Sequence, residues 1–409
     1  MPVSNKVLVQ AACAAAVALA LPLSALHAQE AARPEVGHAL EAAETAIRQK
    51  HFDVAKAELD RADAVKNHTP YEAATIEQTR GVLAQASGDT DGALAIFRNL
   101  LTTEKMPLAD KARMEHSVAA LAFQKQDYSG SSDYAARAIQ DGDKDPSLQL
   151  IIAEAAYASG DYKRAYAATQ AQVQAQARTG GKPTQAQLQM LASAAQKSGD
   201  DAGYGSALDS LAANYPDPAV AVALLARLQA KPGATNRYSL DIVRLKRRLA
   251  LLKTADDYQE AAQLVLSSGF PGEASSLIAE AYARHVFGQP AEAARQERLK
   301  AYADKQLAQD QAGMEHARSE AADAHDGGAL VRVGFDLATQ GDAAGIGLIE
   351  QGVKKGGMAR PEQAMLTLGE AYAQAGRKAD AVATFRKVNG TDGSGDLAHL
   401  WTIALQLSS

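Results

Sequence analysis

A short turn recurs along this chain and restricts the folds available to it. The turn is centred on one landmark residue, often the glycine of ASGD, KSGD, TQGD or QAGR, and it separates two alanine-rich segments. Eight landmarks follow one another at intervals of 38, 38, 34, 39, 70, 72 and 35 residues. A repeat of this length indicates an array of small supersecondary units. The landmarks are Lys50, Gly88, Gln126, Gly160, Gly199, Gly269, Gly341 and Gly376.

Small residues recur at a fixed distance before the landmarks, and further small or apolar residues follow at fixed distances after them. Glycine or alanine at a helix crossing lets two backbones approach, and a larger side chain one turn later fills the next groove. The pattern predicts stacked helical hairpins. The residues seven before the landmarks are Ala43, Gly81, Ala119, Ala153, Ala192, Ala262, Gly334 and Gly369. Those five after are Ala55, Ala93, Ser131, Ala165, Tyr204, Ala274, Ile346 and Ala381, and those nine after are Leu59, Phe97, Ala135, Thr169, Leu208, Ile278, Glu350 and Phe385.

The composition agrees with a helical fold and excludes other classes. Hydrophobic residues at 47% and charged residues at 22% supply enough apolar surface for a core, which excludes wholesale disorder. About 90 residues are alanine and only 5% are aromatic, a balance that favours helices over sheets. The formal net charge of -6 argues against nucleic acid as the main ligand. We therefore predict an all-α protein.

The first 28 residues have the features of a secretory signal peptide. Lys6 precedes a continuous apolar run, Pro22 breaks this run, and Ala28 is a small residue at the expected cleavage site. An uncleaved membrane anchor is the alternative, although the run is short for a span and contains Gln10. Cleavage would remove Cys13, the only cysteine of the chain. We expect a periplasmic or secreted protein with no stable membrane insertion after cleavage.

The last repeat, LGEAYAQAGRKADAVATFRKV, resembles a tetratricopeptide repeat. Met365 stands where this family has an aromatic residue, and the closing proline is absent. GVLAQASGDTDGALAIF, which begins at Gly81, resembles the family less completely. The resemblance implies a right-handed α-solenoid whose concave groove holds peptides or protein segments, and a scaffolding role without catalysis. The matching residues of the last repeat are Leu368, Gly369, Tyr372, Gly376, Ala381 and Phe385.

The pattern divides the chain into four parts. Residues 1–28 are the predicted signal peptide, 29–218 are N-terminal tetratricopeptide-like repeats, 219–326 are an irregular helical region, and 327–409 are C-terminal repeats with a capping helix. The irregular region is either a run of degenerate repeats or a distinct all-helical insert. Within it, Pro290 suits a helix start, and Gly313 is a candidate interruption of the helix that follows.

Three acidic residues alternate like the start of a calcium-binding loop. They are Asp141, Asp143 and Asp145, but Pro146 replaces the obligatory glycine and Ile152 stands where the bidentate glutamate belongs. Asp145 followed by Pro146 is better explained as a helix cap with proline at the first helical position.

Other motifs with catalytic or metal-binding associations are incomplete. GTDGSGD from Gly390 lacks the Lys-Ser/Thr pair of a phosphate loop, so we interpret it as a loop before the last helix. His316 and Glu320 share a helix face, but two ligands do not make a zinc site. No serine lies in a nucleophile elbow. We therefore expect no enzyme activity, no metal site and no cofactor.

Two further segments have alternative interpretations. LAHLWTIALQL, which contains Trp401, is predicted to cap the hairpin of Phe385, and the alternative is a docking segment for another protein or a second copy. A basic cluster is either a solvated helix face or a patch for an acidic partner or an anionic glycan. The cluster consists of Arg244, Lys246, Arg247, Arg248 and Lys253.

In the resembling family, the first helix of each hairpin lines the groove. The residues ten, six and three before the landmarks fall on that face, where glutamine recurs and cations are nearly absent. An amide-lined groove would hydrogen-bond a peptide backbone or glycan hydroxyls, with aromatic side chains as anchors. The alternative is that these glutamines are solvated helix formers. The candidate partner-binding residues are Gln78, Gln85, His116, Phe123, Glu154, Tyr157, Gln189, Gln196, Gln259 and Gln263.

The sequence thus favours an exported tetratricopeptide-like scaffold or adaptor in envelope or secretion assembly. Its expected partner is a protein or peptide, with a glycan as the alternative ligand and no role for nucleic acid. Two other functions stay open: an exported enzyme that acts on cell-wall polymers with a helical superhelix, and a component of an exopolysaccharide export machine.

Overall fold

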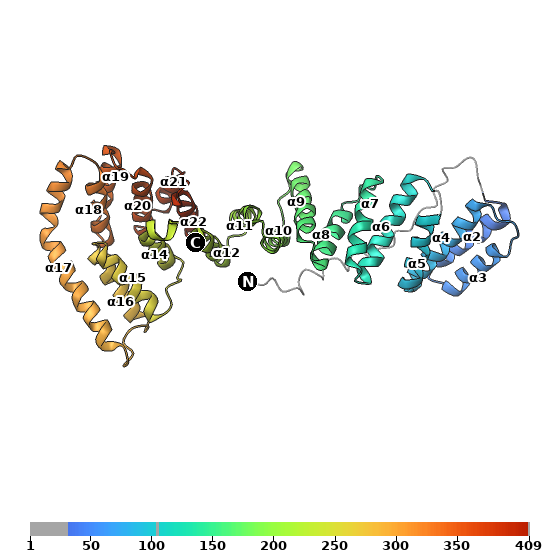
Figure 1. The fold of residues 1–409 in the computed structure, drawn as a ribbon, viewed down its shortest axis with the longest axis horizontal. Coiled ribbons are helices and arrows are strands. Elements are labelled where there is room, and N and C mark those ends of the chain that lie inside the picture. The colour runs from blue at the N-terminus through green and yellow to red at the C-terminus, as the bar shows by residue number, and fades with distance from the viewer. Residues whose placement is uncertain (1–31, 104–105, 408–409) are drawn as a thin grey trace. The chain divides into compact units, whose positions relative to one another are not determined.

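The computed structural model describes residues 32–103 and 106–407. In this part of the chain every regular element is a helix and no strand occurs, so the predicted all-α class is confirmed. Helices pack mainly against their neighbours in sequence, as in a helical solenoid (Figure 1). None of the described helices combines the length and the apolar character needed to cross a membrane. The predicted signal peptide, residues 1–28, lies outside the described residues.

The chain divides into two compact units, and the boundary falls within helix α11. Unit 1 is Met1–Ala207 and unit 2 is Leu208–Ser409. The helices up to the boundary are α2 (Pro34–Arg48), α3 (Phe52–Asp63), α4 (Pro70–Ser87), α5 (Thr90–Thr103), α6 (Leu108–Gln124), α7 (Tyr128–Gln140), α8 (Ser147–Ser159), α9 (Tyr162–Arg178), α10 (Gln185–Ser198) and α11 (Asp201–Asn214).

Unit 2 contains eleven further helices in the described residues. They are α12 (Pro218–Ala230), α13 (Ala234–Arg237), α14 (Ser239–Arg248), α15 (Ala255–Ser267), α16 (Pro271–Ala283), α17 (Ala293–Asp323), α18 (Gly328–Thr339), α19 (Ala344–Lys355), α20 (Pro361–Gln374), α21 (Lys378–Phe385) and α22 (Ser394–Leu407).

All eight landmarks lie between two consecutive helices, and all eight have a positive φ angle. The six glycines have φ between 74° and 89°, a conformation that glycine adopts without a steric penalty. Lys50 and Gln126 adopt it with φ of 59° and 63°. A left-handed residue ends an α-helix because it turns the chain away from the helix axis. The predicted hairpin turns are therefore confirmed.

In four of these turns an aspartate after the landmark starts the second helix. Asp89, Asp127, Asp161 and Asp200 each accept a hydrogen bond from the backbone N–H three residues further on, at 2.9–3.2 Å. Such a bond satisfies one of the free N–H groups of the first helical turn. The landmark and the aspartate after it therefore together end one helix and begin the next; the landmark is glycine in three of these turns and Gln126 in the fourth.

The small residue seven positions before each landmark is buried in all eight hairpins. A Cβ atom added to Gly81 would lie 2.3 Å from the ring of Phe97, and one added to Gly369 would lie 2.4 Å from the ring of Phe385. In both hairpins the aromatic ring of the second helix thus occupies the space that a side chain would need. The predicted close approach of the paired helices is confirmed.

Two positions of the predicted packing pattern are not buried. Tyr204 is only half-buried, and its neighbours Gly203 and Gly205 are buried in its place. Glu350 is exposed, and its carboxylate accepts a hydrogen bond of 2.6 Å from the hydroxyl of Tyr372. Glu350 therefore contributes a hydrogen bond where the pattern predicted an apolar contact.

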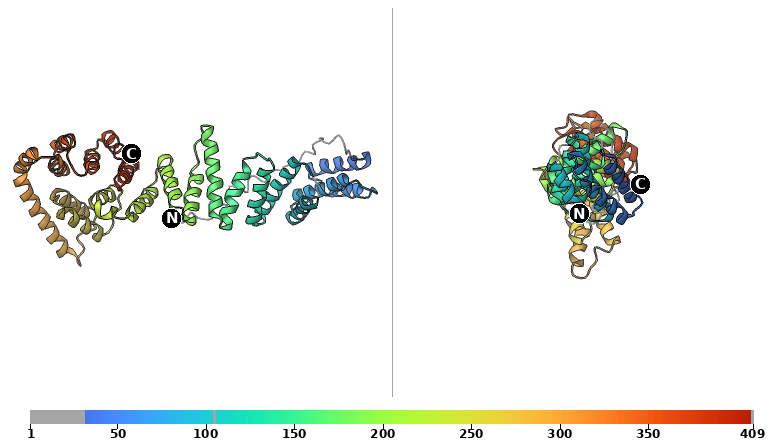
Figure 2. Two further views of the ribbon diagram at one scale, coloured as in Figure 1. Left: turned by 45° about the horizontal axis from the view of Figure 1, so that its top comes forward. Right: turned by 90° about the vertical axis from the view of Figure 1, so that its right-hand side faces the viewer.

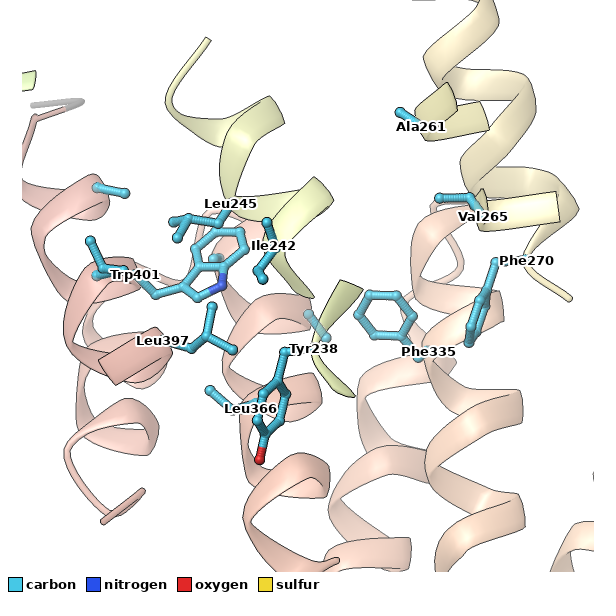
Figure 3. Packing of buried hydrophobic residues seen from close by; sticks show 14 of the residues in the cluster. Tyr238, Ile242, Leu245, Ala261, Val265, Phe270, Phe335, Leu366, Leu397 and Trp401 are labelled. Atoms are coloured by element: carbon cyan, nitrogen blue, oxygen red, sulfur yellow. The ribbon is translucent and has the colours of Figure 1, made fainter. Parts of the chain in front are cut away.

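The cores of the two units are organised differently. In unit 1 the buried apolar residues form several small clusters, each confined to one or two neighbouring hairpins. In unit 2 one cluster runs from α12 to α22, and Figure 3 shows Tyr238, Phe335, Leu366 and Trp401 within it. Trp401 stacks on Phe385 with ring centroids 5.8 Å apart. α22 also packs against α12 and α14, so unit 2 closes on itself.

α17 is continuous over 31 residues and connects α16 to α18 (Figure 2). Its residue Gly313 lies in open space and does not interrupt the helix, contrary to the expected break. The helix begins three residues after Pro290 and not at it. Most of its side chains are exposed or half-buried, so helix propensity and pairs such as Lys300–Asp304 support it.

A buried charge network lies in the centre of unit 2. The guanidinium of Arg244 donates to both carboxylate oxygens of Glu273, at 2.9–3.2 Å, and its Nη1 donates to Glu370 at 3.2 Å. The same guanidinium lies over the ring of Phe335, 4.1 Å from its centroid. Asp241, one turn earlier on α14, is also buried. One cation therefore faces three buried carboxyl groups.

This excess of acid raises the pKa of two of the carboxyl groups. Burial raises the pKa of Asp241, and burial together with the neighbouring Asp241 raises that of Glu370. In the folded protein both groups therefore keep a proton to a higher pH than a free carboxyl group does. The two interpretations of the basic cluster both placed Arg244 at the surface and are wrong for this residue. Arg244 can be buried because Glu273 and Glu370, which lie more than 25 residues away along the chain, pair with its guanidinium.

Replacement of Gly369 by alanine should lower the free energy of unfolding of unit 2 by about 1–3 kcal/mol, because the added methyl group overlaps the ring of Phe385. Gly347→Ala is the matched control, since Gly347 is helical and has open space around its Cβ position. The control should be neutral or raise stability by about 0.5–1 kcal/mol. Urea unfolding followed by the fluorescence of Trp401, the only tryptophan, measures both; equal effects would contradict the packing argument.

The stability of unit 2 should fall as the pH rises above about 4, the ordinary pKa of a carboxyl group. Asp241 and Glu370 have a higher pKa when folded, so the folded state binds more protons than the unfolded state until the pH passes the raised values. Each group contributes a slope of at most about 1.4 kcal/mol per pH unit. Unfolding followed through Trp401 at a series of pH values measures this slope.

Glu370→Gln should flatten this pH dependence, because glutamine keeps an acceptor for Arg244 and stays neutral at every pH. Glu273→Gln should instead lower stability by about 3 kcal/mol throughout, because it removes the two-point partner of a buried guanidinium. If the stability of Glu370→Gln changed with pH as steeply as that of the wild type, the proton uptake would have to come from other groups.

Candidate functional site

The predicted partner-binding residues lie on the first helices of the hairpins, but not all of them are accessible. Eight belong to unit 1, on α4, α6, α8 and α10. Gln259 and Gln263 belong to α15 in unit 2, where Gln259 is buried and Gln263 is exposed. In unit 1, Gln196 is exposed and His116 is buried. The half-buried residues are Gln78, Gln85, Phe123, Glu154, Tyr157 and Gln189.

His116 is buried, and both of its ring nitrogens contact side chains of the same unit. Its Nδ1 lies 3.0 Å from the carboxylate of Asp143, and its Nε2 lies 3.3 Å from the hydroxyl of Ser147. These contacts connect α6 to the loop before α8. Asp145 in the same loop accepts a hydrogen bond of 2.8 Å from the N–H of Ser147, as expected of a capping residue. The helix begins at Ser147, however, so Pro146 precedes it and is not its first residue, contrary to the prediction from the sequence. Asp143 and Asp145 are thus bound to protein groups.

An aromatic cluster with one lysine lies where α8, α9 and α10 meet. Tyr157 and Tyr162 pack edge to face with centroids 5.3 Å apart. The ammonium of Lys197 lies 4.9 Å and 4.8 Å from these two ring centroids, a geometry that favours cation–π attraction. The hydroxyl of Tyr157 also lies 2.6 Å from that of Ser193. The cluster joins two neighbouring first helices and leaves part of each ring accessible.

The preceding hairpin carries the same aromatic pair. Phe123 and Tyr128 pack edge to face at 5.4 Å, at positions three before and two after their landmark. Tyr157 and Tyr162 occupy the same two positions. The sequence-based selection found the first member of each pair and missed the second, together with Lys197. An aromatic residue two positions after the landmark was the signal that could have identified Tyr128 and Tyr162.

Glu154 lies on α8 one turn before Tyr157. Its Oε2 atom is buried and has no hydrogen-bond partner among the described residues. Burial raises the pKa of Glu154 to about 7. The corresponding positions of α6 and α10 carry the small residues Ala120 and Ser193. The carboxyl group therefore lies on a partly open face without a cation to pair with.

A cavity of about 750 Å³ opens further along the same face of α8. Leu150 contributes to its lining, and the α7–α8 loop, α9 and the start of α10 form the rest. The amide of Gln187 donates to the side-chain carbonyl of Gln172 at 3.2 Å. Nε2 of Gln172 and Oε1 of Gln176 are buried without a partner. The cavity thus offers an unpaired donor and an unpaired acceptor, which is what a peptide group requires.

The described residues contain little that suggests catalysis. No group of three or more His, Cys, Asp or Glu side chains among them could hold a metal ion. Unit 2 has cavities of about 500 and 430 Å³ on either side of Arg244. The chemistry at their common wall is the internal pairing of Arg244 with Glu273 and Glu370. Buried polar atoms without a hydrogen-bond partner occur in both units, and in unit 1 they include atoms of Glu154, Gln172 and Gln176.

No protein-family model matches the chain, and no curated protein matches it either. Function must therefore be inferred from the residues of the chain itself.

Proposed function

We propose that this protein is an exported tetratricopeptide-like scaffold that binds a peptide segment of another protein along α6, α8 and α10. The main support for this proposal is a row of three half-buried side chains on one face of α8. Leu150 lies beside the cavity, Glu154 in the middle and Tyr157 in the aromatic cluster. Seven residues of helix separate Leu150 from Tyr157, a distance of about 10 Å. An extended segment of three to four residues covers that distance.

The chemistry of this row supports a peptide as the ligand. Accessible tyrosine and phenylalanine rings supply apolar contact area at a low cost in side-chain entropy. Nε2 of Gln172 and Oε1 of Gln176, which have no partner among the described residues, match the acceptor and the donor of a peptide group. The tetratricopeptide resemblance of the repeats supports the same class of ligand. The protein then acts by holding a partner and not by transforming it.

The apolar run before Ala28 supports a location in the periplasm or outside the cell. A scaffold of this kind would act in envelope or secretion assembly.

The double variant Phe123→Ala/Tyr157→Ala should bind peptides at least about tenfold more weakly than the wild type, because it removes two aromatic anchors. The peptides are selected from a displayed random library for binding to the mature chain. Their affinities are measured by fluorescence anisotropy. Tyr302→Ala is the control, since Tyr302 is an exposed tyrosine of α17 in unit 2. Equal binding by both variants, with unchanged helix content, would place the site elsewhere.

Fusion of residues 1–60 to an alkaline phosphatase should give activity outside the cytoplasm, because the enzyme is active only after export. Leu19→Arg should abolish this activity, since it introduces a charge into the apolar run. A fusion that begins at residue 29 is the negative control. Activity that survives Leu19→Arg would contradict the signal-peptide hypothesis.

A further inference from the structure

Glu154 differs from the other buried carboxyl groups of unit 1 in having no cation. Glu72 pairs with Arg33 at 2.8 Å, and Glu115 has the ammonium of Lys111 at 3.8 Å. Glu154 forms neither an ion pair nor a hydrogen bond with any described residue, and its Oε2 is covered by protein atoms. A buried carboxylate without a partner is costly, and a cation from outside the chain would relieve this cost.

None of the described charged groups on the helices around α8 pairs with Glu154, and several of them are engaged elsewhere. On α6, His116 contacts Asp143, and on α9, Arg164 pairs with Asp133 of α7 at 2.6 Å. Arg137 of α7 lies over the ring of Tyr134, 5.0 Å from its centroid, and Lys197 of α10 lies over Tyr157 and Tyr162. Burial alone raises the pKa of Glu154, which agrees with the absence of a nearby charge.

We propose that Glu154 pairs with a lysine or arginine side chain of the bound segment, so that the site selects basic peptides. This inference rests on the peptide-binding function proposed above. An ammonium or guanidinium group would supply the missing hydrogen-bond donors for the carboxylate. The ring of Tyr157, one turn further along α8, can pack against the aliphatic part or the cation of the same side chain. The acidic net charge of the chain favours the same kind of partner.

Binding of a cation at this position should release a proton. The free site holds Glu154 with a pKa of about 7, and a paired cation favours the ionised carboxylate. Affinity for a basic peptide should therefore rise with pH from about 5 to 7 by up to tenfold per pH unit, and level off above about 8. A purely structural role of Glu154 would not produce this dependence.

The test compares peptides selected from a random library by the mature wild-type chain and by Glu154→Gln. Glu315→Gln is the matched control, because Glu315 is a highly exposed glutamate of α17. Wild-type and control selections should show lysine or arginine at a fixed position, and Glu154→Gln should lose this preference. For a selected lysine peptide, Glu154→Gln should lower affinity at pH 7.5 about 10-fold or more, and should remove the pH dependence. Acetylation of the peptide lysine should have the same effect on the wild type.

The outcomes separate this inference from the proposed function. Enriched peptides without a fixed basic residue, or the same basic preference in Glu154→Gln, would overturn the role of Glu154 and leave peptide binding intact. Failure of the wild-type chain to enrich any peptide would contradict peptide binding itself, and the inference with it. Circular dichroism of Glu154→Gln confirms that the helices are retained in the variant that is compared.

Discussion

Close contact between paired helices is the constraint on which the rest of the structure depends. Where Gly81 meets the ring of Phe97, and where Gly369 meets that of Phe385, a single methyl group has no room. Phe123 and Tyr157 occupy the same position, three residues before the landmark, in neighbouring hairpins, and each packs edge to face on an aromatic residue two positions after that landmark. The face that we propose for recognition in unit 1 thus follows the repeat of the hairpins.

Local features of the structure could be predicted from the sequence, and features that depend on distant residues could not. The turn at Gly160 was predictable because glycine adopts a positive φ and aspartate caps the next helix within three residues. The burial of Arg244 was not, because Glu370 is 126 residues away and only the fold brings it close. His116 was assigned to the binding face for the same reason, since its partners follow 27 and 31 residues later. Helical position alone does not reveal which side chains find a partner.

The two units use acidic residues in opposite ways. In unit 2, Arg244 pairs with Glu273 and Glu370 within the core, and the pKa values of Asp241 and Glu370 are raised. In unit 1, Glu154 lies on a partly open face. Arg244 and its acidic partners join α14, α16 and α20, whereas Glu154 has no partner among the described residues. Under our proposal the same residue type supports architecture in one unit and recognition in the other.

The contact of α22 with α12 and α14 has a consequence for the order in which the protein folds. These helices are separated by more than 140 residues of sequence, so the core of unit 2 can close only after the ribosome has made the last helix. Hairpins of unit 1 contact only their neighbours and can form one after another as they emerge. Until α22 arrives, the apolar surface that it later covers is exposed to the solvent. A chain of this design therefore depends on protection against aggregation late in its synthesis, and not early.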